Sequence, residues 1–270
     1  MRKETICLML VATMISLVSV SVYADESCDS QITESVGKHF NIENFKSLVE
    51  DGVIIAAACK TWPYKDDIVI SVFAYAAEPK EKEDMESEKG LLVVMLDKHS
   101  RSIISSYRGT IAEDAITEVG PDSFQLDTAR YQLSKDVRAF GVRFRSAARA
   151  PSCAENDVGN ELTLFVPNGN ELRPVFRQFM NFQRALSGCI GVVTGHDAWE
   201  YASLSISIEK TANHGYADLK ISAVIEPDTN IQPPPPTMDM KKRVETYRLH
   251  FDGTAYAPVG EAPWWWAIAL

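Results

Sequence analysis

The sequence predicts a mainly β fold, an antiparallel β-sandwich or open barrel with a short helical region near the N-terminus. Beyond Asp67, apolar and polar residues alternate along much of the chain, which is the pattern of strands with one buried face. Turn sequences such as Asn168-Gly169 and Asp252-Gly253 separate these alternating segments. Short antiparallel strands joined by regular turns favour a sandwich or an open barrel.

Residues 1–24 predict a secretory signal peptide. Arg2 and Lys3 precede an apolar run from Ile6 to Val20, and Val22-Tyr23-Ala24 has the small-x-Ala form after which a signal peptidase cuts. An uncleaved anchor is the alternative, but the apolar run is shorter than the roughly 20 residues that a spanning helix needs. The rest of the chain is therefore expected to be exported into an oxidising compartment.

Residues 25–270 are expected to form a single mainly β domain that opens with a helical segment over residues 41–60. Asn41 is a candidate N-cap, and an apolar helix face follows it. The face consists of Phe45, Leu48 and Val49. After an interruption at Asp51-Gly52, the alanine-rich stretch from Val53 to Lys60 predicts a second short helix.

The β body is expected to span about residues 67–270. Ile68 to Tyr75 is almost continuously apolar and predicts a strand that is buried on both faces. Glu78 to Lys89 is densely charged and predicts a solvated loop. Further strands are expected over Leu91–Leu96, Ser102–Tyr107, Phe124–Leu126, Ala139–Arg145, Leu162–Val166, Leu172–Arg177, Ser203–Glu209, Ala217–Glu226 and Thr246–Phe251. Pro233 to Pro236 predicts a stiff connector or, alternatively, a polyproline docking segment.

Four cysteines lie outside the leader, and an even number in an exported chain predicts disulfides. They are Cys28, Cys59, Cys153 and Cys189. Of the three pairings that are open, the sequential one is preferred, Cys28 with Cys59 and Cys153 with Cys189. Each bond would then stabilise the fold by roughly 3 to 4 kcal/mol through loop closure. No two of these cysteines have the short spacing of a zinc site.

Composition argues against several function classes. The chain has 27 Lys and Arg against 37 Asp and Glu, a formal net charge of −10, which disfavours binding to a nucleic-acid backbone. The sequence lacks a Gly-rich phosphate loop, a G-x-S-x-G elbow and an H-E-x-x-H helix, so neither a cofactor nor a standard catalytic motif is expected. No later segment is apolar enough to span a membrane.

Three groups of residues are candidate sites. His196, Asp197 and Glu200 combine imidazole and carboxylate groups that could hold a divalent metal, although a polar turn explains them as well. Four arginines form an anion-binding stripe or pair with acidic residues on a neighbouring strand. They are Arg138, Arg143, Arg145 and Arg149. Trp264, Trp265 and Trp266 cannot all point the same way in an extended chain, so they predict either an interaction surface or a clamped C-terminal strand.

One resemblance concerns the C-terminal third. Gly215-Tyr216-Ala217-Asp218-Leu219 and Phe251-Asp252-Gly253-Thr254-Ala255-Tyr256 resemble the hairpins that end many uncharacterised secreted bacterial proteins. The resemblance implies a bacterial periplasmic β protein and brings no catalytic residue with it.

These observations favour an exported binding or interaction protein over an enzyme. One concrete version is an inhibitor or immunity-type protein that occludes a cell-envelope hydrolase, with a protein as its partner. The alternatives are a metal-assisted hydrolase that uses His196, Asp197 and Glu200, and a structural or accessory protein of the cell envelope.

Overall fold

A computed structural model describes residues 28–76, 87–149, 156–187, 198–229 and 241–266. The predicted signal peptide, the predicted Cys153–Cys189 disulfide and the Pro233–Pro236 segment lie outside the described residues. Within the described residues the protein is mainly β, with one α-helix and an open sheet of twelve strands, so the predicted fold class is confirmed.

The elements follow one another as α1 (Ser30–Phe40), η1 (Leu48–Glu50, a 3-10 turn), β1 (Ile54–Thr61), β2 (Ile68–Ala76), β3 (Ser87–Asp97), β4 (Ile103–Glu113), β5 (Phe124–Gln132), β6 (Arg138–Phe144), β7 (Asn156–Asn168), β8 (Glu171–Ser187), β9 (Ala198–Asn213), β10 (Tyr216–Thr229), β11 (Arg243–Phe251) and β12 (Tyr256–Pro258). All ten strands that the alternation predicts between residues 68 and 251 are present, most of them longer than expected. The end of the predicted charged loop, residues 87–89, belongs to β3 instead.

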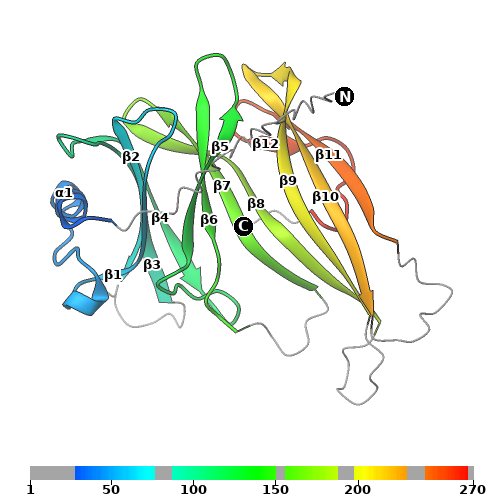
Figure 1. Cartoon of the computed structure of the whole chain (residues 1–270), viewed down its shortest axis with the longest axis horizontal. Coiled ribbons are helices and arrows are strands. Elements are labelled where there is room, and N and C mark those ends of the chain that lie inside the picture. The colour runs from blue at the N-terminus through cyan, green and yellow to red at the C-terminus, as the bar shows by residue number, and fades with distance from the viewer. Residues whose placement is uncertain (1–27, 77–86, 150–155, 188–197, 230–240, 267–270) are drawn as a thin grey trace, which may run out of the picture.

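The sheet branches at β8. Strands β1 to β4 form one antiparallel meander, and strands β5 to β12 form another. A single parallel bridge between Ser106 of β4 and Glu171 of β8 joins the two. The order β1-β2-β3-β4-β8-β7-β6-β5 therefore nearly surrounds one core and leaves β1 and β5 unpaired with each other. Figure 1 shows α1 beside β1 and β2 at one end of the molecule and β9 to β11 at the other.

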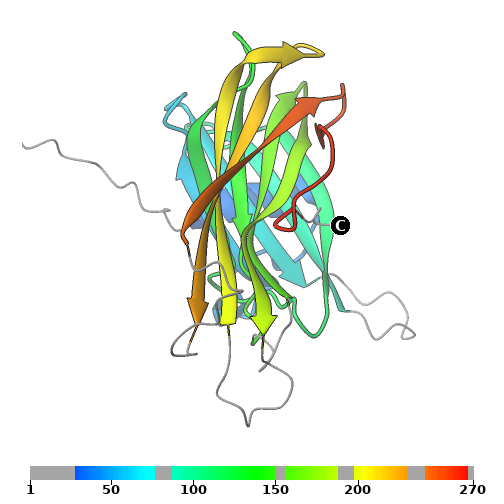
Figure 2. The same cartoon turned by 90° about the vertical axis from the view of Figure 1, so that its right-hand side faces the viewer.

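Three apolar clusters fill this frame. The first lies between the β1–β4 meander and strands β5 to β7, and includes Val72, Met95 and Phe140. The second lies on the opposite face of the β1–β4 meander, where α1 covers it with Ile32 and Val36. Burial on both faces explains why β2 is almost continuously apolar. The third cluster lies on the inner face of β7 to β12, where the C-terminal segment turns back over the sheet (red in Figure 2).

The predicted helical segment over residues 41–60 is wrong. The helix precedes it, and Asn41 ends α1 in the left-handed conformation (φ 52°) instead of beginning a helix. Residues 54–61 form the strand β1, in which Ala56 and Ala58 face the first core and Cys59 faces α1. Only the short turn η1 lies where helix was expected. The high helix propensity of alanine is a weak preference, and packing against two layers overrides it.

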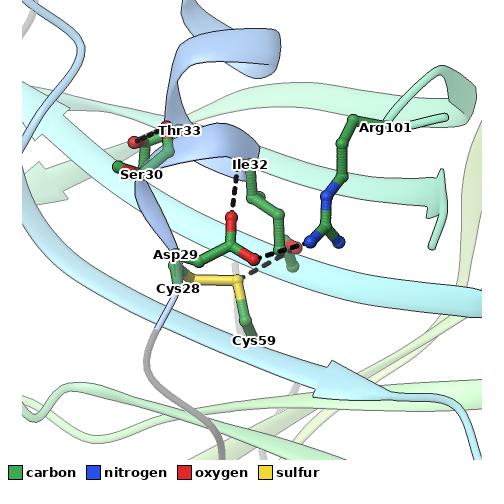
Figure 3. Close-up of a disulfide and its surroundings, with 8 residues drawn as sticks. Cys28, Asp29, Ser30, Ile32, Thr33, Cys59 and Arg101 are labelled. Atoms are coloured by element: carbon green, nitrogen blue, oxygen red, sulfur yellow. Dashed lines mark hydrogen bonds and ion pairs between the residues drawn. A yellow bond between two sulfur atoms is a disulfide. The ribbon is translucent and has the colours of Figure 1, made fainter. Parts of the chain in front are cut away.

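A disulfide anchors the N-terminus of α1 to β1. Cys28 and Cys59 are bonded, as the sequential pairing predicts (Figure 3). Asp29 is the N-cap, because its carboxylate accepts the Ile32 N–H at 2.8 Å. The other carboxylate oxygen accepts from Arg101 at 2.8 Å, which ties the helix start to the β3–β4 turn. The helix position is thus fixed by one covalent bond and one ion pair.

Candidate interaction sites

The C-terminal tryptophans pack against the protein itself. Trp265 is fully buried, and its indole Nε1 donates to Glu245 Oε2 of β11 at 2.7 Å. Trp264 and Trp266 are half-buried, and the guanidinium of Arg184 on β8 stacks 4.1 Å from the Trp264 ring centroid. Trp265 is therefore a core residue. The predicted interaction surface is reduced to the partly exposed faces of Trp264 and Trp266.

Glu200 lies on the same inner sheet face as these tryptophans and is held by two arginines. Arg184 Nε and Nη2 donate to its Oε2 at 2.9 and 2.5 Å, and Arg243 Nη1 donates to its Oε1 at 2.6 Å. Burial acts to raise the pKa of Glu200, but the hydrogen bonds from Arg243 and Arg184 outweigh it, and the pKa is lowered. Both oxygens are thus engaged by cations, which makes Glu200 a poor ligand for a metal.

The rest of the predicted metal group, His196 and Asp197, lies outside the described residues. Within the part of the chain that the structure describes, no three His, Cys, Asp or Glu side chains are grouped so that they could hold a metal ion. The structure does connect two candidates that the sequence kept apart. Arg243 donates to both Glu200 and Glu245, so Glu200 and Trp265 belong to one network across β8, β9 and β11.

The predicted arginine stripe pairs with an acidic residue on the adjacent strand. Arg143 of β6 donates from Nε and Nη2 to Asp127 Oδ2 of β5 at 3.0 and 2.7 Å. Arg138 stacks over the ring of Tyr64 at 4.8 Å from its centroid, and Arg145 and Arg149 are exposed. The four side chains therefore do not form one anion-binding surface, because the charge of Arg143 is already compensated by Asp127.

A groove lies between α1 and β1, where sequence analysis placed no site. Its volume is about 770 Å³, and α1, the segment before β1, β1 itself and the loop before β5 line it. The floor includes the exposed Ala57 of β1. The rim carries charges of both signs, with Glu34 and Lys38 on α1 and Lys46 on the segment before β1. A groove of this size accommodates a few residues of an extended chain.

Among the described residues, no strand pairs with the outer edge of β1 at Ala57, along this groove. β1 is the terminal strand of the sheet and pairs with β2 on one side. Trp62 N–H donates to the Ile68 carbonyl at 2.8 Å, which fixes which pairs of the β1–β2 ladder are hydrogen-bonded. Because bonded and non-bonded pairs alternate, the backbone groups of Ala57 and Cys59 point to the outer edge. An unpaired edge of this kind is a template for another strand.

The chain itself begins such a strand. Ser47 forms a parallel bridge with Ile54, and the Ile54 N–H donates to the Lys46 carbonyl at 2.9 Å. No described strand continues this pairing beyond Ile54. Sequence analysis missed the groove because Val53 to Lys60 was assigned to a helix, which has no edge to offer.

A buried carboxylate on the outer side of the C-terminal hairpins was also missed. Asp218 of β10 accepts from Asn213 Nδ2 at 2.7 Å and contacts His250 Nδ1 of β11 at 2.8 Å. Burial acts to raise the pKa of Asp218, but hydrogen bonds from Thr211, Asn213 and His250 outweigh it and lower the pKa. Asp218 and His250 both fall on the polar faces of predicted strands. The β9–β10 ladder has a bulge between Ala217 and Leu219, where Asp218 lies, and no pattern in the sequence signals this bulge.

None of the helices among the described residues has the length and apolar character to cross a membrane. The carboxylates of Asp127, Glu200 and Asp218 are each paired with their own counter-groups. Comparison of the chain with protein-family models, with curated proteins and with solved structures found no match in any of the three.

Proposed function

We propose that the chain is an exported binding protein that recognises an extended segment of a partner protein by adding it as a strand to β1. The observation that carries this proposal is the outward-facing backbone of Ala57 on the floor of the groove beside α1. The chemistry of the occupant follows from the edge, since unpaired backbone N–H and C=O groups in register are matched by another extended backbone. The bridge between Ser47 and Ile54 supports it further, because the chain already pairs with β1 at Ile54 through this one isolated parallel bridge.

The side chains around the groove suit this mode of binding. Ala57 presents only a methyl group, so a second backbone can approach closely. The rim carries charged residues of both signs, which disfavours a partner segment of one uniform charge. Main-chain hydrogen bonds would supply the affinity, and the pockets for alternate side chains would supply the specificity.

The partner class that fits best is a cell-envelope enzyme. The predicted export and the absence of standard catalytic motifs in the sequence both support an inhibitor or immunity-type role. In this role the edge would capture a loop of a cell-envelope hydrolase and occlude its substrate cleft. On this proposal the partner protein binds at β1 and not at the tryptophans.

The test removes one backbone donor without touching the β1–β2 ladder. Phage-displayed random peptides are selected on the mature chain with its disulfides intact, and the selected peptides are titrated against Ala57→Pro and Ala57→Ser by fluorescence polarisation. Proline is tolerated at an edge position whose N–H points outward, so the fold is retained while the added strand loses a donor. We expect Ala57→Pro to weaken binding about tenfold or more, which corresponds to about 1.4 kcal/mol, and Ala57→Ser to bind as the wild type does.

Thermal unfolding followed by circular dichroism checks that Ala57→Pro is folded. A folded Ala57→Pro variant that binds the selected peptides as tightly as the wild type contradicts the proposal. Selection that yields no peptide competing for the groove contradicts it as well.

A further inference from the structure

A second cavity lies on the outer side of β5 to β8 and shares no lining residue with the groove beside α1. Its volume is about 510 Å³, which is within the range of small-molecule sites. Polar side chains dominate its wall. They include Asp122, Gln125, Arg143, Arg145, Asn160 and Asn181. These residues come from the start of β5, from β6 and its end, and from β7 and β8. Segments distant in the sequence therefore build a single polar wall.

The wall is organised by a chain of hydrogen bonds. Arg143 Nη1 donates to Asn160 Oδ1 at 3.3 Å, and Asn160 Nδ2 donates to Asn181 Oδ1 at 3.1 Å. At the other end, Asp127 Oδ2 binds Arg143 and also accepts from the Tyr131 hydroxyl at 2.9 Å. Both amides are thereby fixed in orientation, which is the preorganisation that a polar ligand requires.

Asn160 enters this chain in a left-handed backbone conformation. It has a positive φ of 54°, and the β7–β8 ladder has no pair between Gly159–Asn181 and Glu161–Phe179, although its register is unchanged across this point. Asn is one of the few residues that adopts this conformation at low cost. The Asn160 amide contacts both Arg143 and Asn181 from this position.

The charges that a ligand in this cavity would meet lie on two side chains, Arg145 and Asp122. The charge of Arg143 is compensated by Asp127, whereas Arg145 is exposed and forms no ion pair with any residue that the structure describes. Asp122 is exposed on the same wall and offers a carboxylate that accepts hydrogen bonds. A ligand complementary to both needs an oxyanion for Arg145 and hydroxyl donors for Asp122.

We propose that this cavity binds a hydroxylated carboxylate of sugar-acid type, such as a uronate. The carboxylate pairs with Arg145, because the planar guanidinium matches it in a bidentate geometry. The hydroxyls bond to Asp122 and to the amides of Gln125, Asn160 and Asn181, since each amide both donates and accepts. A polyanion is disfavoured, because the whole chain carries a net charge of −10.

The experiment titrates the mature chain with D-glucuronate and, in parallel, with D-glucose, following backbone and side-chain amide signals by NMR. The two probes differ only at C6, where glucuronate has a carboxylate and glucose has a hydroxymethyl group. We expect saturable shifts of the Asn160 and Asn181 side-chain amides with glucuronate, at least tenfold weaker binding of glucose, and an affinity that falls with added salt. Arg145→Gln should weaken glucuronate binding about tenfold and leave glucose binding unchanged.

Arg130→Gln is the matched control, because Arg130 is an exposed arginine of β5 that does not line the cavity. It should bind glucuronate as the wild type does. Equal shifts with glucose, equal losses in Arg145→Gln and Arg130→Gln, or shifts reproduced in full by sodium sulfate would overturn the proposal. The site is independent of the groove at β1, so Ala57→Pro should retain glucuronate binding whatever its effect on peptides.

Discussion

Glu200 is a carboxylate on the inner face of a sheet, where it is stable because two guanidinium groups donate to it. Arg184 and Arg243 are about one-third exposed, whereas the Glu200 side chain is 5% exposed. The buried carboxylate is therefore the member of the network whose loss is expected to lower the free energy of unfolding most. Removing Glu200 would leave two arginines facing an apolar cluster that includes Ala202 and Ile225.

Glu200→Gln is expected to destabilise the fold by about 2 to 3 kcal/mol, since it weakens the charge-assisted hydrogen bonds, leaves Arg184 without its carboxylate and leaves Arg243 with Glu245 alone. Glu226→Gln is the matched control, because Glu226 pairs with Lys242 on the exposed surface and surface pairs contribute about 0 to 1 kcal/mol. Urea unfolding of both variants measures the difference. Equal stability of the two variants would mean that the inner network contributes no more than a surface pair.

Asp218 predicts a pH dependence that can be derived in sign. Its pKa is lowered in the folded state, so the folded protein holds this carboxylate ionised at pH values where the unfolded chain binds a proton. The stabilisation is fully present above the unfolded pKa of about 3.9 and is lost as the pH falls through the folded pKa.

Asp218→Asn should therefore be less stable than the wild type at neutral pH by about 1 to 3 kcal/mol, and the deficit should shrink below roughly pH 4. Chemical unfolding at neutral pH and near pH 3 measures this. Asp66→Asn is the control, because Asp66 is exposed. A deficit that stays constant across this range would contradict a role for the ionised carboxylate.

At the scale of elements, α1 depends on its anchors more than on its own sequence. It has eleven residues, a length at which an isolated helix is marginal in water. The disulfide to β1 and the Asp29–Arg101 ion pair hold it over the sheet, where Ile32 and Val36 are buried. The groove proposed to bind a partner therefore has one wall that is covalently fixed.

Replacing both Cys28 and Cys59 by serine should lower the free energy of unfolding by about 2 to 4 kcal/mol. The loop that the bond closes separates the cysteines by 31 residues in sequence. Hydrogen exchange should show loss of protection in α1 first, with β9 and β10 keeping their protection, because they lie at the other end of the molecule. Uniform loss of protection in α1, β9 and β10 would contradict this view of α1 as a locally anchored element.

Sequence periodicity predicts strands correctly where one face of the strand is exposed to solvent. Leu204, Ile206 and Ile208 alternate with three serines in β9, and the structure places the serines at the surface, as that pattern requires. Periodicity fails for β1, because its run of alanines looks helical in a single sequence, whereas in the structure Ala56 and Ala58 pack on the first core and Ala57 is exposed. It also placed Glu200 and Trp265 in separate sites, since their connection runs through Arg243 and Glu245 on another strand.

At the scale of the whole molecule, β8 is the strand through which the β1–β4 meander joins the β5–β12 meander. It pairs with β7 along most of its length, pairs with β9 over Asn181–Ser187, and touches β4 through the bridge between Ser106 and Glu171. Local pattern predicts the segments that pair as hairpins, and turns such as Asn168-Gly169 mark them, but it carries no information on this distant parallel bridge. The separation of β1 from β5, and with it the groove, is therefore a property of the assembled fold.

The uncovered edge of β1 also governs how the purified protein behaves in storage. When no other segment is present, the unpaired backbone groups of this edge are expected to pair with the same edge of a neighbouring molecule. The bridge from Ser47 pairs with Ile54 only and leaves Ala57 without a paired strand among the described residues. Concentrated stocks should therefore self-associate edge to edge and lose colloidal stability before they lose their fold. An excess of a groove-binding peptide would act as a formulation additive, because it occupies the surface through which the molecules meet.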